Sequence, residues 1–331
     1  MIQFGIMGAG NIARKFADAV RQVEGAQVAA VASKSLERAQ AFAQEQHIPA
    51  GYGSYQEMLQ RPDIDAVYIA TTNNFHYENI LQCLEHGKHV LCEKSMVLHT
   101  RQAEEVFALA REKGLFLMEC MWVRFLPKIQ KVKEWVETGR IGKLKCAQGN
   151  LGFYAGKDLT TRAYNPALGS GSMYDLGVYL IEVLGYFATE PLTQVESTVV
   201  RAPTGVDETA SFLLRYGDYL VDGQCSVGTA LPENGGLYGE EGYIALRERL
   251  HTGGRVELYD RSGRLVEEYV QEDVNGFIYQ VREAVRCIGA GLLESPTVPH
   301  SMTLECCRVF EQVLGAERKR AAGELPAALC L

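Results

Sequence analysis

Apolar and polar positions divide the chain into two regions with different periodicities. Up to Cys120, short apolar runs alternate with segments in which apolar side chains recur every four residues, as Ile12, Phe16 and Val20 do. This alternation predicts strands joined by crossover helices, and therefore a parallel sheet covered on both faces. The expected strands are Ile2–Met7, Gln27–Ala32, Ala66–Ala70, His89–Cys92 and Leu115–Glu119.

After Cys120 the periodicity changes. Between residues 192 and 270, β-branched and polar residues alternate between Gly and Asp turns, which predicts the hairpins of an open, mainly antiparallel sheet. Around this sheet we expect four helices and one further strand. The helices are Phe125–Thr138, the apolar Leu176–Phe187, and two closing helices near Phe277–Ile288 and Met302–Arg320, and the strand is Leu144–Leu151. The fold class is therefore α/β, with one domain over 1–120 and a second α/β domain over 121–331.

Composition excludes several classes of protein. With 331 residues, 47% hydrophobic and 22% charged, the chain is long enough for two globular domains. A net charge of −8 without a block of like charge argues against a nucleic-acid partner. No apolar run approaches the ~20 residues of a membrane span. The first residues read as a buried strand rather than a signal peptide, and the nine cysteines form no CxxC pair, so we expect a cytoplasmic protein.

A glycine-rich turn lies between the first expected strand and the first expected helix. Its sequence, Gly8-Ala9-Gly10-Asn11-Ile12-Ala13, is a GxGxxA motif. In this context Gly8 permits the tight turn, Gly10 lets the backbone approach a pyrophosphate, and Ala13 lets the helix pack closely. The helix N-terminus then offers N–H groups to the phosphates. The motif predicts a Rossmann dinucleotide-binding domain, the alternative being a turn that binds no ligand.

The end of the second expected strand bears on which dinucleotide binds. An NAD enzyme places Asp or Glu there to bond the ribose hydroxyls. Here the position is Ser33-Lys34, with Arg38 one turn into the next helix. A hydroxyl and two cations suit a 2′-phosphate. We therefore expect NADP(H) to be preferred, with NAD(H) as an alternative if Lys34 and Arg38 are simply solvated.

Candidate reactive groups follow several of the strands and a Gly/Ser-rich turn at residues 169–172. Residues 70–76, 92–95 and 118–125 are expected at the carboxyl ends of parallel strands, where such sheets bind ligands. In the second domain Asp175 and Tyr179 stand four residues apart, so on a regular α-helix they share one face. Alone, this pair has an alternative interpretation as a helix-start carboxylate and a core tyrosine. The seven histidines show no metal-ligand spacing, so we expect no metal site.

The motifs together resemble a known family. GxGxxA at Gly8–Ala13, Thr71 with His76, Glu93-Lys94, and the segment Gly171–Tyr179 occur in the order found in Gfo/Idh/MocA oxidoreductases. Residues 121–125 and 295–300 resemble in particular the branch with dimeric dihydrodiol dehydrogenases and NADP-dependent D-xylose dehydrogenases. The resemblance implies a Rossmann domain, a second domain whose open sheet mediates oligomerisation, and alcohol–carbonyl chemistry on polyhydroxylated substrates.

The resemblance also implies roles for individual residues. Lys94 matches the family's catalytic lysine, Asp175 its helix aspartate and Tyr179 its proton-transfer residue. The cofactor residues implied by the motifs are Gly8, Gly10, Asn11, Ile12, Ala13, Ser33, Lys34, Arg38, Thr71, Asn73, Asn74, His76, Glu93 and Lys94. The expected substrate-pocket residues are Trp122, Arg124, Phe153 and Tyr154, with interdomain packing as the alternative.

Two positions depart from the family pattern. Ser95 and Thr72 stand where relatives usually carry proline. Because proline fixes φ, we expect its absence from these turns to affect the pose of the substrate more than that of the cofactor. The expected function is NADP(H)-dependent hydride transfer between nicotinamide and a CH–OH/C=O group of a sugar, polyol or cyclic diol. The alternatives are an NAD(H)-linked inositol or glycoside dehydrogenase and a catalytically silent dinucleotide sensor. A homodimer or homotetramer formed through the second sheet is expected.

Overall fold

The computed structural model describes residues 1–247, 249–272 and 275–321, and in it the chain divides into two compact units. Unit 1 comprises Met1–Leu126 together with the described residues of 273–304, and unit 2 comprises Pro127–Glu272 together with the described residues after Leu304. The sequence-based division placed everything after residue 120 in the second domain. Residues 275–304 instead pack within unit 1, where the His300 ring stacks on Phe107 at 3.8 Å between centroids.

Unit 1 is built on a parallel sheet, as the sequence predicted. Its strand order in the described residues is β3-β2-β1-β4-β5-β6. The strands are β1 Ile2–Met7, β2 Ala26–Ala32, β3 Gly51–Tyr52, β4 Ala66–Ile69, β5 His89–Cys92 and β6 Leu117–Glu119. Its α-helices include α1 Asn11–Val20, α2 Leu36–Glu45, α3 Tyr55–Leu59, α4 Asn73–Glu85, α5 Thr100–Lys113 and α8 Phe277–Gly289. The short β3 and α3 have no counterpart among the predicted elements.

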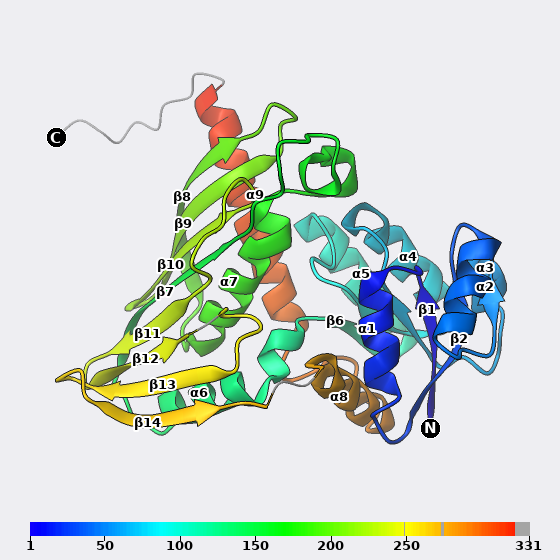
Figure 1. The fold of residues 1–331 in the computed structure, drawn as a ribbon, viewed down its shortest axis with the longest axis horizontal. Helices are drawn as coiled ribbons and strands as arrows, with labels where there is room; N and C mark the ends of the chain where they lie inside the picture. Colours follow the sequence, from blue (N-terminus) through cyan, green and yellow to red (C-terminus); the bar gives the residue numbers. More distant parts are fainter. Residues whose placement is uncertain (248, 273–274, 322–331) are drawn as a thin grey trace. The chain divides into compact units, whose positions relative to one another are not determined.

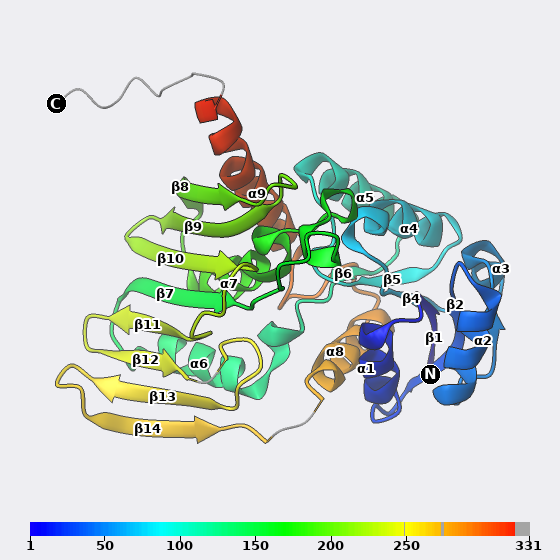
Figure 2. The ribbon, with the colours of Figure 1, turned by 45° about the horizontal axis from the view of Figure 1, so that its top comes forward.

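Helix α1 is held against the sheet by its apolar face. Phe16 is fully buried, stacks on Tyr68 of β4 at 3.7 Å, and meets Phe4 of β1 edge-on at 5.5 Å. Burying a side chain of this size stabilises a fold by roughly 1.5–3 kcal/mol. This packing fixes the start of α1 just beyond the end of β1. On its outer side α1 lies beside α8, as Figures 1 and 2 both show.

Unit 2 contains an open sheet that is antiparallel except where β10 pairs with β7. The strand order in the described residues is β14-β13-β12-β11-β7-β10-β9-β8, which Figure 2 displays. The strands are β7 Leu144–Gly152, β8 Leu192–Arg201, β9 Asp207–Tyr216, β10 Tyr219–Ser226, β11 Gly235–Gly239, β12 Gly242–Leu246, β13 Arg255–Asp260 and β14 Leu265–Val270. This confirms the predicted second domain with a mainly antiparallel sheet.

Helices cover one face of this sheet. Helix α7 (Val178–Leu184) lies beside β7 and β10 (Figure 1). A Cβ added to Gly149 of β7 would meet Leu180 and Leu184 at 2.9 and 3.0 Å, so the glycine allows this close approach. The remaining helices around the sheet are α6 Pro127–Glu137 and the later part of α9 His300–Ala321.

Among the described residues, no helix is both long and apolar enough to cross a membrane. The eight cysteines that the structure describes are free thiols, and most are buried.

Candidate active site

The GxGxxA turn has the geometry that a pyrophosphate requires. Gly8 adopts φ +100°, and a Cβ there would lie 2.7 Å from the Ala70 carbonyl oxygen, so only glycine fits. Gly10 precedes α1 without a side-chain cap, and a Cβ added to it would have nothing within 4 Å. Ala13 is fully buried against the sheet. The open backbone at the positive end of α1 therefore fits the phosphates of a dinucleotide.

The residues after β2 form a cationic segment beside this turn. Ser33 is buried, whereas Lys34 and Arg38 are exposed. Ser35 caps α2, because its Oγ accepts a hydrogen bond from the Arg38 N–H at 3.3 Å. The Lys34 ammonium lies 3.8 Å from the centroid of the Phe75 ring, at the start of α4. Sequence reasoning missed Phe75, because nothing along the chain links it to Lys34.

His76 connects two of the predicted loops. It is fully buried, and its Nε2 and Nδ1 lie 3.1 Å from the Thr71 carbonyl and 3.0 Å from the Ser95 carbonyl. The Thr71 hydroxyl accepts a hydrogen bond from Asn79 at 3.0 Å. The His76 ring thus ties the segment after β4 to the segment after Lys94. Of the other residues predicted there, Asn73 is buried and Asn74 accepts the Thr72 hydroxyl proton at 2.7 Å.

Glu93 is buried just after the end of β5 and immediately before Lys94. The Tyr68 hydroxyl donates a hydrogen bond to its Oε1. Burial raises the pKa of Glu93 to about 7, against the opposing effects of the Tyr68 hydrogen bond and of the Lys94 charge and backbone N–H. The Phe16–Tyr68 stack therefore links α1 of the cofactor turn to the carboxyl group beside Lys94.

A second buried carboxyl group holds the chain just after Lys94. Glu119, at the end of β6, accepts hydrogen bonds from the Met96 N–H at 2.9 Å and from the Thr303 hydroxyl at 2.7 Å. Burial raises its pKa, while these bonds and the charges of Arg124 and Lys94 oppose the shift. The Lys94–Ser95 peptide bond is cis. The Lys94 segment is thus anchored on both sides by buried hydrogen bonds.

We predict that Glu93 makes stability fall with rising pH. Because its folded-state pKa of about 7 exceeds the unfolded value of 4.5, its contribution is complete below pH 4.5 and is lost as pH rises through 7. The gap between the two values corresponds to roughly 3 kcal/mol. Between pH 4.5 and 8, urea unfolding should show the free energy of unfolding of the wild type falling by up to that amount relative to that of Glu93→Gln. The Gln side chain keeps an oxygen that can accept the Tyr68 hydrogen bond. Exposed Glu112→Gln is the control, and parallel pH profiles for wild type and Glu93→Gln would contradict the assignment.

The two pocket residues predicted in unit 1 are anchored within that unit. Trp122 and Arg124 lie in the 3-10 turn Trp122–Phe125. The Trp122 ring lies 5.5 Å from that of Phe277 in α8, and the buried Arg124 guanidinium donates to the Thr297 carbonyl at 3.1 Å. Packing within unit 1 thus accounts for these contacts, and the substrate role of both residues stays a prediction.

In unit 2, a buried carboxylate fixes the start of the helical segment that carries Asp175 and Tyr179. Asp207 accepts hydrogen bonds from the Ser172 hydroxyl at 2.9 Å and the Met173 N–H at 2.6 Å. Gly171 adopts φ +127°, and a Cβ on it would overlap the Asp207 carboxylate. Sequence reasoning missed Asp207 because it arrives from β9, far along the chain.

The prediction of a regular α-helix through Asp175 and Tyr179 is wrong for its first turn. Met173–Gly177 is a π-helical turn, and the α-helix begins at Val178. Close packing of Gly177 accompanies the wider turn, since a Cβ there would lie 2.9 Å from the Met173 sulfur and 3.4 Å from the Cys225 sulfur. Single π-helical turns of this kind occur frequently at functional sites.

The candidate reactive side chains of unit 2 have identifiable neighbours. Asp175 is about a quarter exposed and forms an ion pair with Arg162 at 3.7 Å. Tyr179 is 8% exposed, and its ring stacks on His251 at 5.1 Å. Phe153 and Tyr154, after β7, are 37% and 56% exposed, so their rings are available to a ligand.

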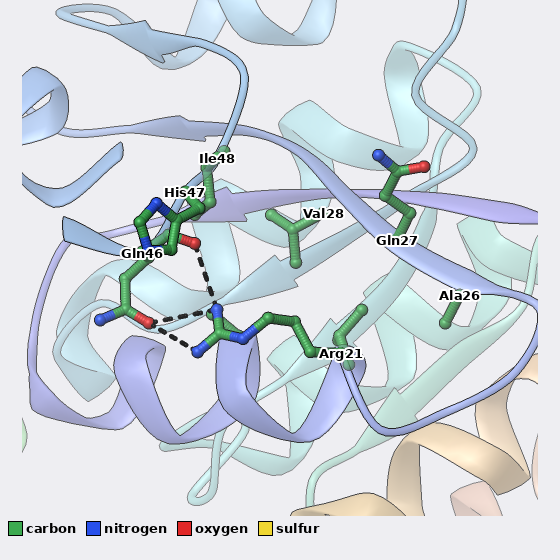
Figure 3. Close-up of a pocket in the computed structure, with 9 residues that line it drawn as sticks. Arg21, Ala26, Gln27, Val28, Gln46, His47 and Ile48 are labelled. Carbon is green, nitrogen blue, oxygen red and sulfur yellow. Dashed lines mark hydrogen bonds between the residues drawn. The ribbon is translucent and has the colours of Figure 1, made fainter. Parts of the chain in front are cut away.

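A small cavity in unit 1 lies away from these groups. Figure 3 shows it between the end of α1, the start of β2 and the segment after α2. Its volume is about 170 Å³, and Arg21 spans it to the Gln46 carbonyl at 3.1 Å. Because it borders the start of β2, it lies at the opposite strand ends from the GxGxxA turn and belongs to no predicted site.

Comparison with known proteins identifies the family. Residues 2–120 match the oxidoreductase family with an NAD-binding Rossmann fold, and residues 129–245 match the GFO/IDH/MocA C-terminal domain. The trans-1,2-dihydrobenzene-1,2-diol dehydrogenase of Mus musculus is 34% identical over 94% of this chain and 95% of its own length. That of Sus scrofa is 31% identical over 99% of both chains.

Solved structures show the same fold. A 3-ketoreductase variant from Actinomadura kijaniata, in complex with TDP-benzene and NADP, has a TM-score of 0.84 at 25% identity, over 94% of this chain and 96% of its own. The aldose-aldose oxidoreductase of Caulobacter crescentus, at 23% identity, covers 98% of both chains with a TM-score of 0.87. The two domain matches and the dihydrodiol dehydrogenase relatives show that the chain belongs to the Gfo/Idh/MocA family of NAD(P)-dependent oxidoreductases.

Proposed function

We propose that this oxidoreductase uses NADP(H) and acts on a CH–OH/C=O group of a sugar, polyol or cyclic diol. The observation that carries the cofactor preference is the end of β2, where Ser33, Lys34 and Arg38 stand and positions 33 and 34 hold no carboxylate. The exposed cations suit a 2′-phosphate, whereas an NAD site needs an acidic residue there. The A. kijaniata reductase, solved with NADP, supports the same choice.

Three side chains carry the proposed chemistry. The GxGxxA turn, with Ser33, Lys34 and Arg38, would hold NADP(H), which would supply the hydride chemistry of the reaction. Tyr179 takes the proton of the substrate hydroxyl in oxidation and gives it back in reduction. Lys94 donates a hydrogen bond to the same oxygen and stabilises its developing negative charge, and Asp175 orients the hydroxyl or the lysine. A free phenol has a pKa of about 10, so positive charge from Lys94 is what makes Tyr179 effective near neutral pH.

The substrate class rests on aromatic side chains and on relatives. The exposed rings of Phe153 and Tyr154 suit the C–H faces of a sugar or cyclic diol, and we assign Trp122 and Arg124 to the same pocket. The names of the relatives point to a dihydrobenzene diol, a keto group and an aldose. NADPH formation with aldoses, inositols and cyclic diols, run beside NADPH oxidation with keto-sugars, identifies the substrate and the favoured direction.

Cofactor titration tests the proposal directly. We expect NADP⁺ to bind at least ~10-fold more tightly than NAD⁺, because each charge-assisted hydrogen bond to the 2′-phosphate adds affinity. Changing Ser33→Asp together with Lys34→Ser should reverse the order, since it restores a carboxylate and removes a cation. Calorimetric Kd values for both nucleotides measure this, and tighter NAD⁺ binding by the unmodified protein would overturn the NADP assignment.

We also propose that the protein forms a homodimer or homotetramer through the sheet face opposite α7. Register places Leu220, Cys146 and Tyr238 side by side on that face. Leu220 is 47% exposed, and the Tyr238, Tyr243 and Tyr259 rings stack in series at 6.0 and 4.7 Å. An exposed leucine beside a row of aromatic rings makes a surface that a second copy would cover.

A further inference from the structure

The contact between Lys34 and Phe75 joins the two strand ends that flank the cofactor turn. Lys34 follows β2 and Phe75 lies in the first turn of α4, which follows β4. Strand β1 pairs with β2 on one side and with β4 on the other. The contact therefore bridges the flanks of β1 at the sheet's carboxyl edge, where the strand order reverses and open α/β sheets bind dinucleotides.

The geometry of the pair is that of a cation–π interaction. The Lys34 ammonium lies 3.8 Å from the centroid of the Phe75 ring. The Phe75 backbone is fixed, because its N–H donates to the Thr72 carbonyl at 2.9 Å in the first turn of α4. The ring therefore sits at a defined place on the edge of the sheet.

The ring holds the lysine without neutralising it. Within the described part of the chain, no carboxylate forms an ion pair with Lys34, and its side chain is exposed. Aromatic rings attract an ammonium through their quadrupole but carry no net negative charge. The ring therefore restricts the flexible stem of Lys34 without adding a negative charge beside it, which lowers the ordering cost of binding a phosphate.

We propose that Phe75 is a specificity-determining residue for NADP(H), because it positions the Lys34 ammonium for the 2′-phosphate. The inference rests on the proposed NADP preference and adds to it a residue outside the cationic segment. The additional affinity that the 2′-phosphate gives to NADP(H) then depends on Lys34 together with Phe75, rather than on Lys34 alone.

Calorimetric titration of Phe75→Leu tests the pair. We expect its Kd for NADP⁺ to rise ~3- to 10-fold and its Kd for NAD⁺ to change less than twofold, because the lost attraction acts through the phosphate-binding cation. The fragments 2′,5′-ADP and 5′-ADP should show the same contrast. In Lys34→Met, which already lacks the cation, adding Phe75→Leu should have little further effect on NADP⁺ affinity.

Two controls separate this role from general damage. Tyr186→Leu removes the ring beneath Lys133, a cation–π pair at 4.4 Å in unit 2, and should change neither Kd. Phe75→Tyr keeps the aromatic face and should restore the NADP⁺ affinity. Thermal unfolding checks that each variant folds.

The outcomes are distinct. Equal weakening of NADP⁺ and NAD⁺ in Phe75→Leu would mean that the ring contacts the adenine instead, and unchanged affinities would mean that it has no role; either result overturns the proposal. Tighter NAD⁺ binding by the wild type would overturn the proposed cofactor preference itself, whatever Phe75→Leu does.

Discussion

Replacing Tyr179 by phenylalanine should lower kcat by ~10²-fold or more, the loss expected when a general acid–base is removed. The substitution deletes one hydroxyl and keeps the ring, which is 8% exposed and stacked on His251. Packing should therefore survive. Because the substitution removes only the hydroxyl that the proposed mechanism directs at the substrate, the Kd for NADP⁺ should stay within about twofold.

Steady-state and single-turnover rates on the substrate found by screening measure the effect. Tyr186→Phe is a matched control, because it deletes a tyrosine hydroxyl from the turn Gly185–Phe187 just after the same helix. That variant should keep wild-type kcat. Wild-type turnover in Tyr179→Phe would remove Tyr179 from the proposed mechanism and leave Lys94 and Asp175 as the remaining candidates.

Local sequence signals predicted the cofactor domain well. The apolar runs gave β1 and β5 with their observed bounds, and GxGxxA gave the turn into α1, because strand alternation and glycine geometry are encoded within a few neighbouring residues. The Lys34 cation was also found locally. Its partner Phe75 was not, since only the pairing of β1 with both β2 and β4 brings them together.

The second unit was harder to predict because its key contacts are non-local. The spacing of Asp175 and Tyr179 reads as an α-helix, and the π-helical turn becomes visible only once Asp207 and Cys225 are seen to pack against its start and its glycine. Likewise, residues 275–304 read as further helices of the second domain, whereas Thr303 and His300 bind Glu119 and the Leu117 carbonyl of unit 1.

Replacing Asp207 by alanine should destabilise unit 2 and slow turnover together. The buried carboxylate accepts the Ser172 hydroxyl and the Met173 N–H, and without it both donors lose their partner. Leaving buried donors unpaired costs about 1–3 kcal/mol each, offset in part because a desolvated carboxylate is removed, so we expect a net loss of roughly 2–4 kcal/mol. Loosening the turn before Asp175 and Tyr179 should lower kcat by ~10- to 10²-fold.

Hydrogen exchange of residues 172–184 separates this positioning role from a general loss of stability. In Asp207→Ala, exchange should accelerate in that segment more than in β10 or in unit 1, because the lost bonds anchor only its start. Asp207→Asn keeps an oxygen that can accept both bonds and should recover most of the stability and most of kcat. Asp222→Ala, which removes an exposed carboxylate from β10, is the matched control. If Asp207→Ala exchanged uniformly faster while kcat per folded molecule stayed at the wild-type value, Asp207 would stabilise the fold without positioning the reactive side chains.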